Sequence, residues 1–166
     1  MKIRVHLIPS NPEQGDPGHM AASWTKGRDE ASPQFRGYVF KINDLPVEFR
    51  SAARWRDYLF DHVVPGYVIN DRKMQVLVES GAKGLFGDAW DATPAQLLLI
   101  EMICRKENKG SYSFNPDDHP GSHNCVTWTV STVNSVMGEV LPKVRQGRIK
   151  LMIEVLSSRG SAAEAS

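Results

Sequence analysis

Residues 116–138 read PDDHPGSHNCVTWTVSTVNSVMG, and they place a single cysteine, Cys125, where a polar loop gives way to an apolar pattern. The apolar residues that follow recur at helical spacing: Val126, Val130, Val133, Val136, Met137, Val140 and Leu141. This spacing predicts a helix that begins at Cys125. Many of these residues are β-branched, so a strand is the competing prediction. The cysteine is then either a small buried residue at the start of a core helix or a nucleophile.

Three runs with the alternation of β-strands open the chain. They cover residues 2–8, 19–25 and 35–42. Segments rich in Pro, Gly, Asn and Asp separate the runs, as expected of turns and loops. We expect these three strands to form an antiparallel meander.

The middle of the chain mixes both periodicities. Apolar residues between Pro46 and Pro65 keep helical spacing and predict a helix. Residues 66–70 and 73–80 alternate and predict two short strands. Residues 84–92, GLFGDAWDA, are interpreted as a loop.

Thr93 and Pro94 form a good helix start, since a Thr cap precedes Pro at the first helical position. The predicted helix carries Cys104 on its apolar side, where a free cysteine behaves as a small hydrophobic residue. A loop of about 17 residues then leads to Cys125, and loops of that length are usually functional or disordered. Residues 148–156 alternate and predict a last strand.

These elements predict one α+β domain over residues 1–156, followed by a disordered tail at 157–166. We expect an antiparallel sheet of about five or six strands packed against about two or three helices.

Composition excludes several classes of function. Lys and Arg number 20 and Asp and Glu number 19, so no basic field predicts nucleic acid or anionic lipid as a partner. No apolar stretch approaches the roughly 18 to 20 residues of a membrane span. The N-terminus does not resemble a signal peptide, and two cysteines make no disulfide framework. We expect a cytoplasmic protein, or one secreted without a cleaved signal peptide, and predict no cofactor.

All five histidines precede Cys125, so a Cys–His pair would have the histidine first in the chain. His19 is the strongest candidate base, because it follows the loop GDPG and opens a strand, a rigid and partly exposed position. His123 lies two residues before Cys125, outside the predicted helix. His62 and His6 lie within predicted elements, where a packing role is at least as common.

A metal site is the alternative use of the loop before Cys125. His119, His123 and Cys125, with Asp117 or Asp118, carry ligand atoms. Their spacing lacks the two paired ligands of a structural zinc site, and we therefore predict no metal.

Two short motifs, GHMAASW at 18–24 with GYVF at 37–40, and HNCVTW at 123–128, carry a family resemblance. In their order and context they resemble the circularly permuted papain-like superfamily. This superfamily includes NlpC-type cell-wall peptidases, the lecithin:retinol acyltransferase group, the deubiquitinating PPPDE proteins and bacterial effectors. The resemblance implies a permuted papain-like fold.

The resemblance assigns His19 as the base and Cys125 as the nucleophile, within an Asn124-Cys125 pair. It implies an oxyanion hole that includes the backbone N–H of Cys125. The third polar residue of this family usually follows the histidine strand, where Gln34, Asn43 and Asp44 are the candidates here. The strand at 35–42 lacks the second histidine of the acyltransferase group, which argues against a lipid acyltransferase.

We therefore expect a thiol hydrolase, a cysteine peptidase or amidase, that attacks an amide, isopeptide or ester carbonyl through an acyl-enzyme. The substrate would be a peptide or protein. Two alternatives remain: a non-catalytic effector or adaptor module on the same scaffold, and a small-ligand or metal-binding domain built on residues 115–125.

Overall fold

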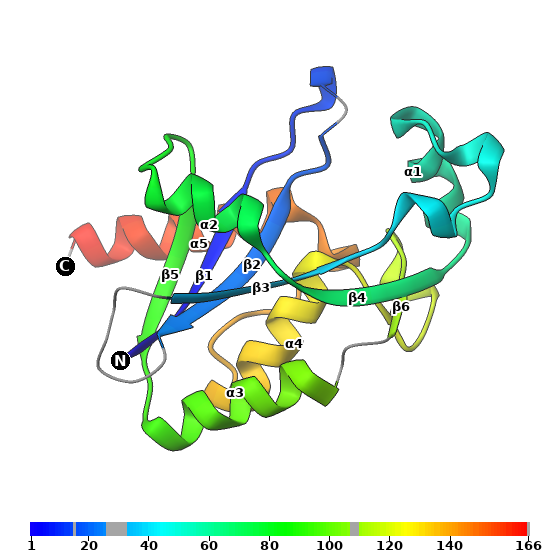
Figure 1. The fold of residues 1–166 in the computed structure, drawn as a ribbon. Helices are drawn as coiled ribbons and strands as arrows, with labels where there is room; N and C mark the ends of the chain where they lie inside the picture. The colour runs from blue at the N-terminus through cyan, green and yellow to red at the C-terminus, as the bar shows by residue number, and fades with distance from the viewer. Residues whose placement is uncertain (15, 26–32, 107–109, 166) are drawn as a thin grey trace.

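The computed structural model describes residues 1–14, 16–25, 33–106 and 110–165, and its fold combines a curled sheet with helices on both faces (Figure 1). The strands are β1 Lys2–Ile8, β2 His19–Thr25, β3 Pro33–Val39, β4 Val64–Asn70, β5 Phe86–Asp91, β6 Gly110–Tyr112 and β7 Ser122–His123. The α-helices are α1 Ala52–Asp61, α2 Arg72–Glu79, α3 Pro94–Lys106, α4 Cys125–Met137 and α5 Ile149–Ala165. Short 3-10 turns connect several of them.

The described part of the chain forms one seven-stranded sheet in the order β5-β1-β2-β3-β4-β6-β7. The predicted meander of the first three strands is confirmed, since β1, β2 and β3 pair antiparallel in sequence order. The prediction of an antiparallel sheet of five or six strands is wrong, because β6 and β7 pair in parallel. The prediction of two or three helices is also too low for the five α-helices of the described residues.

The two faces of β2 are both covered, which explains why its residues are small or apolar throughout. Met20, Ala22 and Trp24 belong to the main core, and α4 packs on this face against β2 and β3. Ala21 belongs to a smaller cluster with Phe35 of β3 and Met74 of α2, on the opposite face. Figure 1 shows α3 and α4 on one side of the sheet and α2 on the other.

Helix α4 is the central element of the main core. It begins at Cys125, as predicted, and its residues are largely buried despite their β-branching. The Trp128 ring stacks on the Tyr38 ring of β3 with centroids 5.8 Å apart and planes within 10°. Tertiary packing of this kind outweighs the weak helix propensity of valine and threonine.

The predicted strand at 73–80 is wrong, since residues 73–79 lie in α2 and Ser80 is its C-cap. Asp71 caps this helix, and its side chain accepts a hydrogen bond from the Met74 N–H at 3.1 Å. Met74 and Val76 alternate in the sequence as strand residues would, but Met74 is buried whereas Val76 is 63% exposed. The cap, rather than the hydrophobic pattern, determines the element here.

The loop predicted at 84–92 contains β5, which pairs antiparallel with β1 at the edge of the sheet. Gly87 lets the two backbones approach closely, because a Cβ at this position would lie 2.5 Å from the Val5 carbonyl oxygen. Glycine in a strand can therefore mark close backbone approach as well as a turn.

The strand predicted at 148–156 is also wrong, because this segment begins α5. Its buried residues Ile149, Met152 and Leu156 follow helical spacing. The helix continues to Ala165, into the residues for which composition predicted a disordered tail. Among the described residues, no helix is both long enough and apolar enough to cross a membrane.

Candidate functional site

Cys125 is the first residue of α4, and the preceding residue fixes the start of this helix. The Asn124 side chain accepts hydrogen bonds from the N–H groups of Val126 at 3.0 Å and Thr127 at 2.9 Å. In return, the Thr127 hydroxyl accepts a bond from the Asn124 N–H at 3.0 Å, which completes a capping box. This arrangement stabilises the helix end and holds the cysteine at a fixed position.

Asn124 also ties the cysteine to a distant loop. Its side-chain amide donates to the carbonyl oxygens of Gln146 at 3.0 Å and Gly147 at 3.2 Å. Gly147 has a φ of +56°, and a Cβ there would lie 2.5 Å from the Asn124 Oδ1. Glycine therefore allows this loop to pack directly on the helix cap.

His19 opens β2, directly after a loop whose shape depends on glycine. Gly18 has a φ of +79°, and its N–H donates to the Asp16 carboxylate at 2.9 Å. His19 itself pairs with Ile8 in the sheet and is mostly buried, with 17% of its side chain exposed. The predicted position at the start of a strand is thus observed.

Asp71 holds one side of the His19 ring. Its Oδ2 makes a short hydrogen bond with the His19 Nε2, while its Oδ1 caps α2 through Met74. The contact lies over Gly37 of β3, where a Cβ would lie 2.2 Å from Asp71 Oδ2 and 3.1 Å from His19 Nε2. A glycine at this position is what leaves space for the pair.

The Cys125 side chain hydrogen-bonds with the His19 ring. Because Asp71 occupies Nε2, the ring nitrogen left for the sulfur is Nδ1. Burial is the largest single influence on the His19 pKa and lowers it. The hydrogen bonds to Asp71 and Cys125, with the charges of these groups, outweigh burial and raise the pKa to about 10.

The pKa of Asp71 shifts in the opposite direction. Burial alone raises it, but the hydrogen bond to His19, the charge of His19 and the N–H of Met74 hold the pKa below its ordinary value. Both shifts favour a protonated imidazole beside an ionised carboxylate at neutral pH.

Tyr112 of β6 also contacts the cysteine. Its hydroxyl accepts a hydrogen bond from the backbone N–H of Cys125, and its ring stacks against Tyr38 with centroids 5.8 Å apart. Burial, with the nearby Cys125, raises the pKa of Tyr112 well above its ordinary value. The hydroxyl therefore keeps its proton at neutral pH and remains a hydrogen-bond donor.

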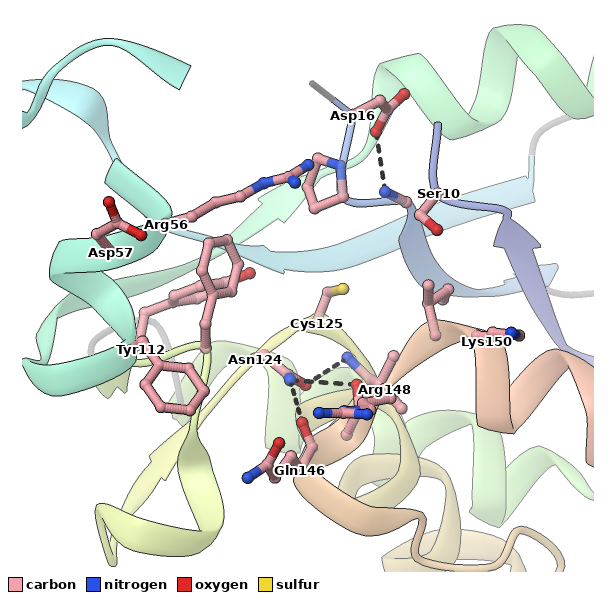
Figure 2. A pocket seen from close by; sticks show the side chains of 17 residues that line it. Ser10, Asp16, Arg56, Asp57, Tyr112, Asn124, Cys125, Gln146, Arg148 and Lys150 are labelled. Carbon is pink, nitrogen blue, oxygen red and sulfur yellow. Dashed lines mark hydrogen bonds between the residues drawn. The ribbon is translucent and has the colours of Figure 1, made fainter. Parts of the chain in front are cut away.

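A cavity of about 520 Å³ opens at this cysteine. Figure 2 shows the Cys125 sulfur pointing into it, between the loop that carries Asp16 and the start of α5. Tyr112 and Asn124 form one part of its wall, and Arg56 of α1 forms another. Its size is in the range of small-ligand sites in proteins.

The structure does not bring the other predicted polar residues to the cysteine. The Gln34 side chain accepts from Arg36 at 2.9 Å, and the Asp44 carboxylate accepts from the Tyr67 hydroxyl at 2.9 Å. The Asn43 carbonyl oxygen accepts from Arg50 at 3.2 Å. None of the three lines the cavity.

His123, His119 and His6 have contacts other than Cys125. The His123 Nδ1 lies 3.2 Å from the Thr127 hydroxyl, and the His119 Nε2 lies 3.2 Å from the Phe60 carbonyl oxygen. His6 contacts the Ser23 hydroxyl at 2.7 Å. Within the described ranges, no three histidine, cysteine or carboxylate side chains gather as a metal site would require.

Sequence reasoning missed Asp71 and Tyr112. The signal for Asp71 was its place directly before Arg72 as a helix cap, which the strand prediction at 73–80 concealed. Tyr112 lies in the segment interpreted as a long loop, and it reaches the site only because β6 pairs with β4.

The chain matches no model of a known protein family, no curated protein and no solved structure. The site therefore rests on its own geometry.

Proposed function

We propose that this protein is a cysteine hydrolase in which Cys125 is the nucleophile, His19 the acid and base, and Asp71 the residue that orients His19. The carrying observation is the chain of contacts from Cys125 through the His19 ring to the Asp71 carboxylate, at the edge of a cavity. A nucleophile, a base and an orienting group within hydrogen-bonding reach form the usual arrangement for acyl transfer.

The charges of the site support this assignment. A protonated His19 beside Cys125 would stabilise the negative charge of an attacking thiolate. The N-terminus of α4, where Cys125 lies, favours negative charge as well. Asp71, held by both Met74 and His19, fixes the orientation of the ring.

In the proposed reaction the Cys125 sulfur forms a bond to the carbonyl carbon of the substrate, and the carbonyl π electrons move to the oxygen. The Tyr112 hydroxyl, which accepts from the Cys125 N–H, would donate its own proton to a hydrogen bond with that oxygen. When the intermediate collapses, the bond to the leaving group breaks, and His19 gives its proton to that group.

Water then attacks the thioester carbon while His19 accepts its proton. The carbon–sulfur bond breaks, which releases the acid and restores the thiolate with protonated His19. The chemistry applies equally to an amide, an isopeptide or an ester, so these remain the proposed substrate bonds. The permuted papain-like fold remains a proposal that rests on the order His19 before Cys125 and on the strand and helix that carry them.

Hydrolysis of p-nitrophenyl acetate tests this function, because an acyl-enzyme releases nitrophenolate in a burst that counts active sites. We expect a burst equal to the protein concentration that disappears in Cys125→Ala and persists in Cys104→Ala. Cys104 is buried on α3 and serves as the matched control. Equal rates for the wild type and Cys125→Ala would exclude the hydrolase and favour a binding module.

A further inference from the structure

Arg56 extends from α1 along the wall of the cavity at Cys125 (Figure 2). Two of its nitrogens, Nε and Nη2, are buried without an acceptor among the described residues. The central carbon of its guanidinium lies 5.8 Å from the centre of the Trp55 ring. This cation–π contact provides no hydrogen-bond acceptor for the guanidinium N–H groups.

The lack of an acceptor for these two nitrogens distinguishes Arg56 from the neighbouring arginines. Arg54 on the same helix donates to the Glu48 carbonyl oxygen at 3.3 Å, and Arg50 donates to the Leu45 carbonyl oxygen at 3.0 Å. Buried donors without acceptors are costly, and more so when they are charged. An acceptor that arrives with a ligand would therefore stabilise this guanidinium, and the side chain would rotate at the cavity wall to present its buried donors.

The two aspartates of the cavity lining, Asp16 and Asp57, do not fill that role. In the described part of the chain the ion pairs join Lys2 to Asp91 and His19 to Asp71, and neither includes Arg56. Asp16 directs its carboxylate at the Gly18 N–H. Asp57 also lines the cavity but makes no ion pair with Arg56.

We propose that the substrate carries a carboxylate close to the bond that Cys125 attacks, and that Arg56 binds this carboxylate. The inference rests on the proposed hydrolase function and specifies its substrate class. Arginine suits this role because its planar fork can donate two parallel hydrogen bonds to one carboxylate. Arg148 and Lys150 also line the cavity and add positive charge.

Such a site would select among peptide substrates. A carboxylate near the scissile bond occurs at a chain end or on an acidic side chain, whereas a neutral internal segment lacks one. We therefore expect short peptides with a free terminal carboxylate, or acidic residues beside the scissile bond, to be preferred over neutral internal segments. Arg56 would touch the substrate but not the reacting atoms.

The test uses bromoacetyl probes, in which Cys125 displaces bromide and forms a carbon–sulfur bond. Bromoacetyl-glycine, bromoacetyl-β-alanine and bromoacetyl-γ-aminobutyric acid place the carboxylate at three distances, and their primary amides are neutral partners. The measured quantity is the acid-to-amide rate ratio at Cys125, divided by the same ratio for free cysteine.

We expect this normalised ratio to reach about 10 for at least one spacer, which corresponds to about 1.4 kcal/mol. Arg56→Gln should bring it to about 1, while the matched variant Arg54→Gln should leave it unchanged. A ratio of 1 or less at all three spacings would overturn the proposal. So would an unchanged ratio in Arg56→Gln, or a loss of the ratio in Lys150→Gln or Arg148→Gln instead.

A binding measurement separates this inference from the hydrolase function and from misfolding. In Cys125→Ala, the N-acetyl acid with the spacer that reacts best should shift the side-chain ¹⁵N resonance of Arg56. Cys125→Ala/Arg56→Gln should lose this binding while keeping its melting temperature. Binding without a nitrophenolate burst would retain the carboxylate site and exclude the hydrolase. A nitrophenolate burst, without binding of the N-acetyl acid and with an acid-to-amide rate ratio of 1 or less, would retain the hydrolase and exclude the carboxylate site.

Discussion

The His19 ring and the Asp71 carboxylate meet above Gly37, although the two residues are 52 positions apart in the sequence. Three elements cooperate in this contact, since β2 supplies the histidine, the cap of α2 supplies the carboxylate, and β3 leaves the space between them. The carboxylate thus serves both the helix and the histidine.

Replacing Asp71 separates these two roles. Asp71→Asn keeps an oxygen for the Met74 N–H, but its amide would donate to the His19 Nε2 and so favour a neutral ring. We expect the nitrophenolate burst rate to fall about 10²- to 10⁴-fold, the range for acid–base groups. The pKa of His19 should fall at the same time, as measured by NMR.

Asp71→Ala is the comparison, because it also removes the cap. It should destabilise the protein by about 1 kcal/mol more than Asp71→Asn does in urea unfolding. Equal stability of the two variants would contradict the capping role, and an unchanged burst rate in Asp71→Asn would contradict the orienting role.

Gly37→Ala should disturb the contact between His19 and Asp71 by steric overlap alone. The added methyl would lie 2.2 Å from the Asp71 Oδ2, so the carboxylate must move away from His19. We expect activity to fall and the protein to lose about 1 to 3 kcal/mol of unfolding free energy. The measurement is a double-mutant cycle in urea.

In that cycle Gly37→Ala is introduced into Asp71→Ala, where the obstructing carboxylate is gone. The cost of the methyl should then fall below 1 kcal/mol, roughly the scale of an unobstructed substitution. The same cost in both backgrounds would show that Gly37 is required for another reason.

The sequence was sufficient for elements whose signals are local. The strand 2–8, the strand 19–25 and the helix from Cys125 follow from alternation, from loop composition and from apolar spacing. Cys125 and His19 were found because each lies where a loop meets a regular element, and such junctions are visible in a single sequence.

The sequence predictions were wrong where both the strand period and the helix period fit the same residues. Residues 148–156 fit alternation, yet Ile149, Met152 and Leu156 fit a helix equally well, and packing against β1 and β5 decides between them. Asp71 was missed in the sequence because the helix that it caps, α2, was predicted as a strand. A partner 52 residues away has no local signature, because only the sheet register brings it to His19.

His6 and His19, which are both partly buried, should have pKa values shifted in opposite directions. Burial, with the charge of Arg4, lowers the pKa of His6 to about 4, whereas Asp71 and Cys125 raise that of His19 to about 10 against the effect of burial. In an NMR titration the His6 ring should stay neutral down to about pH 4, and the His19 ring should stay protonated at pH 8. Cys125→Ala should lower the pKa of His19, and an unchanged value would contradict their contact.

The same shift predicts how stability depends on pH. The unfolded-state pKa of His19 is about 6.5, below its folded value, so its stabilising contribution is complete below about pH 6.5 and is lost as pH rises toward about 10. The stability difference between the wild type and His19→Gln should therefore narrow from pH 6 to pH 10 in urea unfolding. A difference that widens over this range would reverse the sign of the proposed shift.

Asn124 should prove essential to the position of Cys125 rather than to the chemistry. Asn124→Ala removes the cap and leaves the Gln146 and Gly147 carbonyl oxygens without their donor, so we expect a loss of about 2 to 4 kcal/mol of unfolding free energy.

Asn124→Asp is the sharper variant, because it keeps the capping oxygen but turns a second oxygen toward those two carbonyls. It should lose stability through repulsion at the loop while α4 stays capped, and hydrogen exchange should show faster opening around Gly147 than in the first turn of α4. If Asn124→Asp were as stable as the wild type, the bonds from the Asn124 amide to the loop would contribute nothing, and the loop would hold its position against the helix by packing alone.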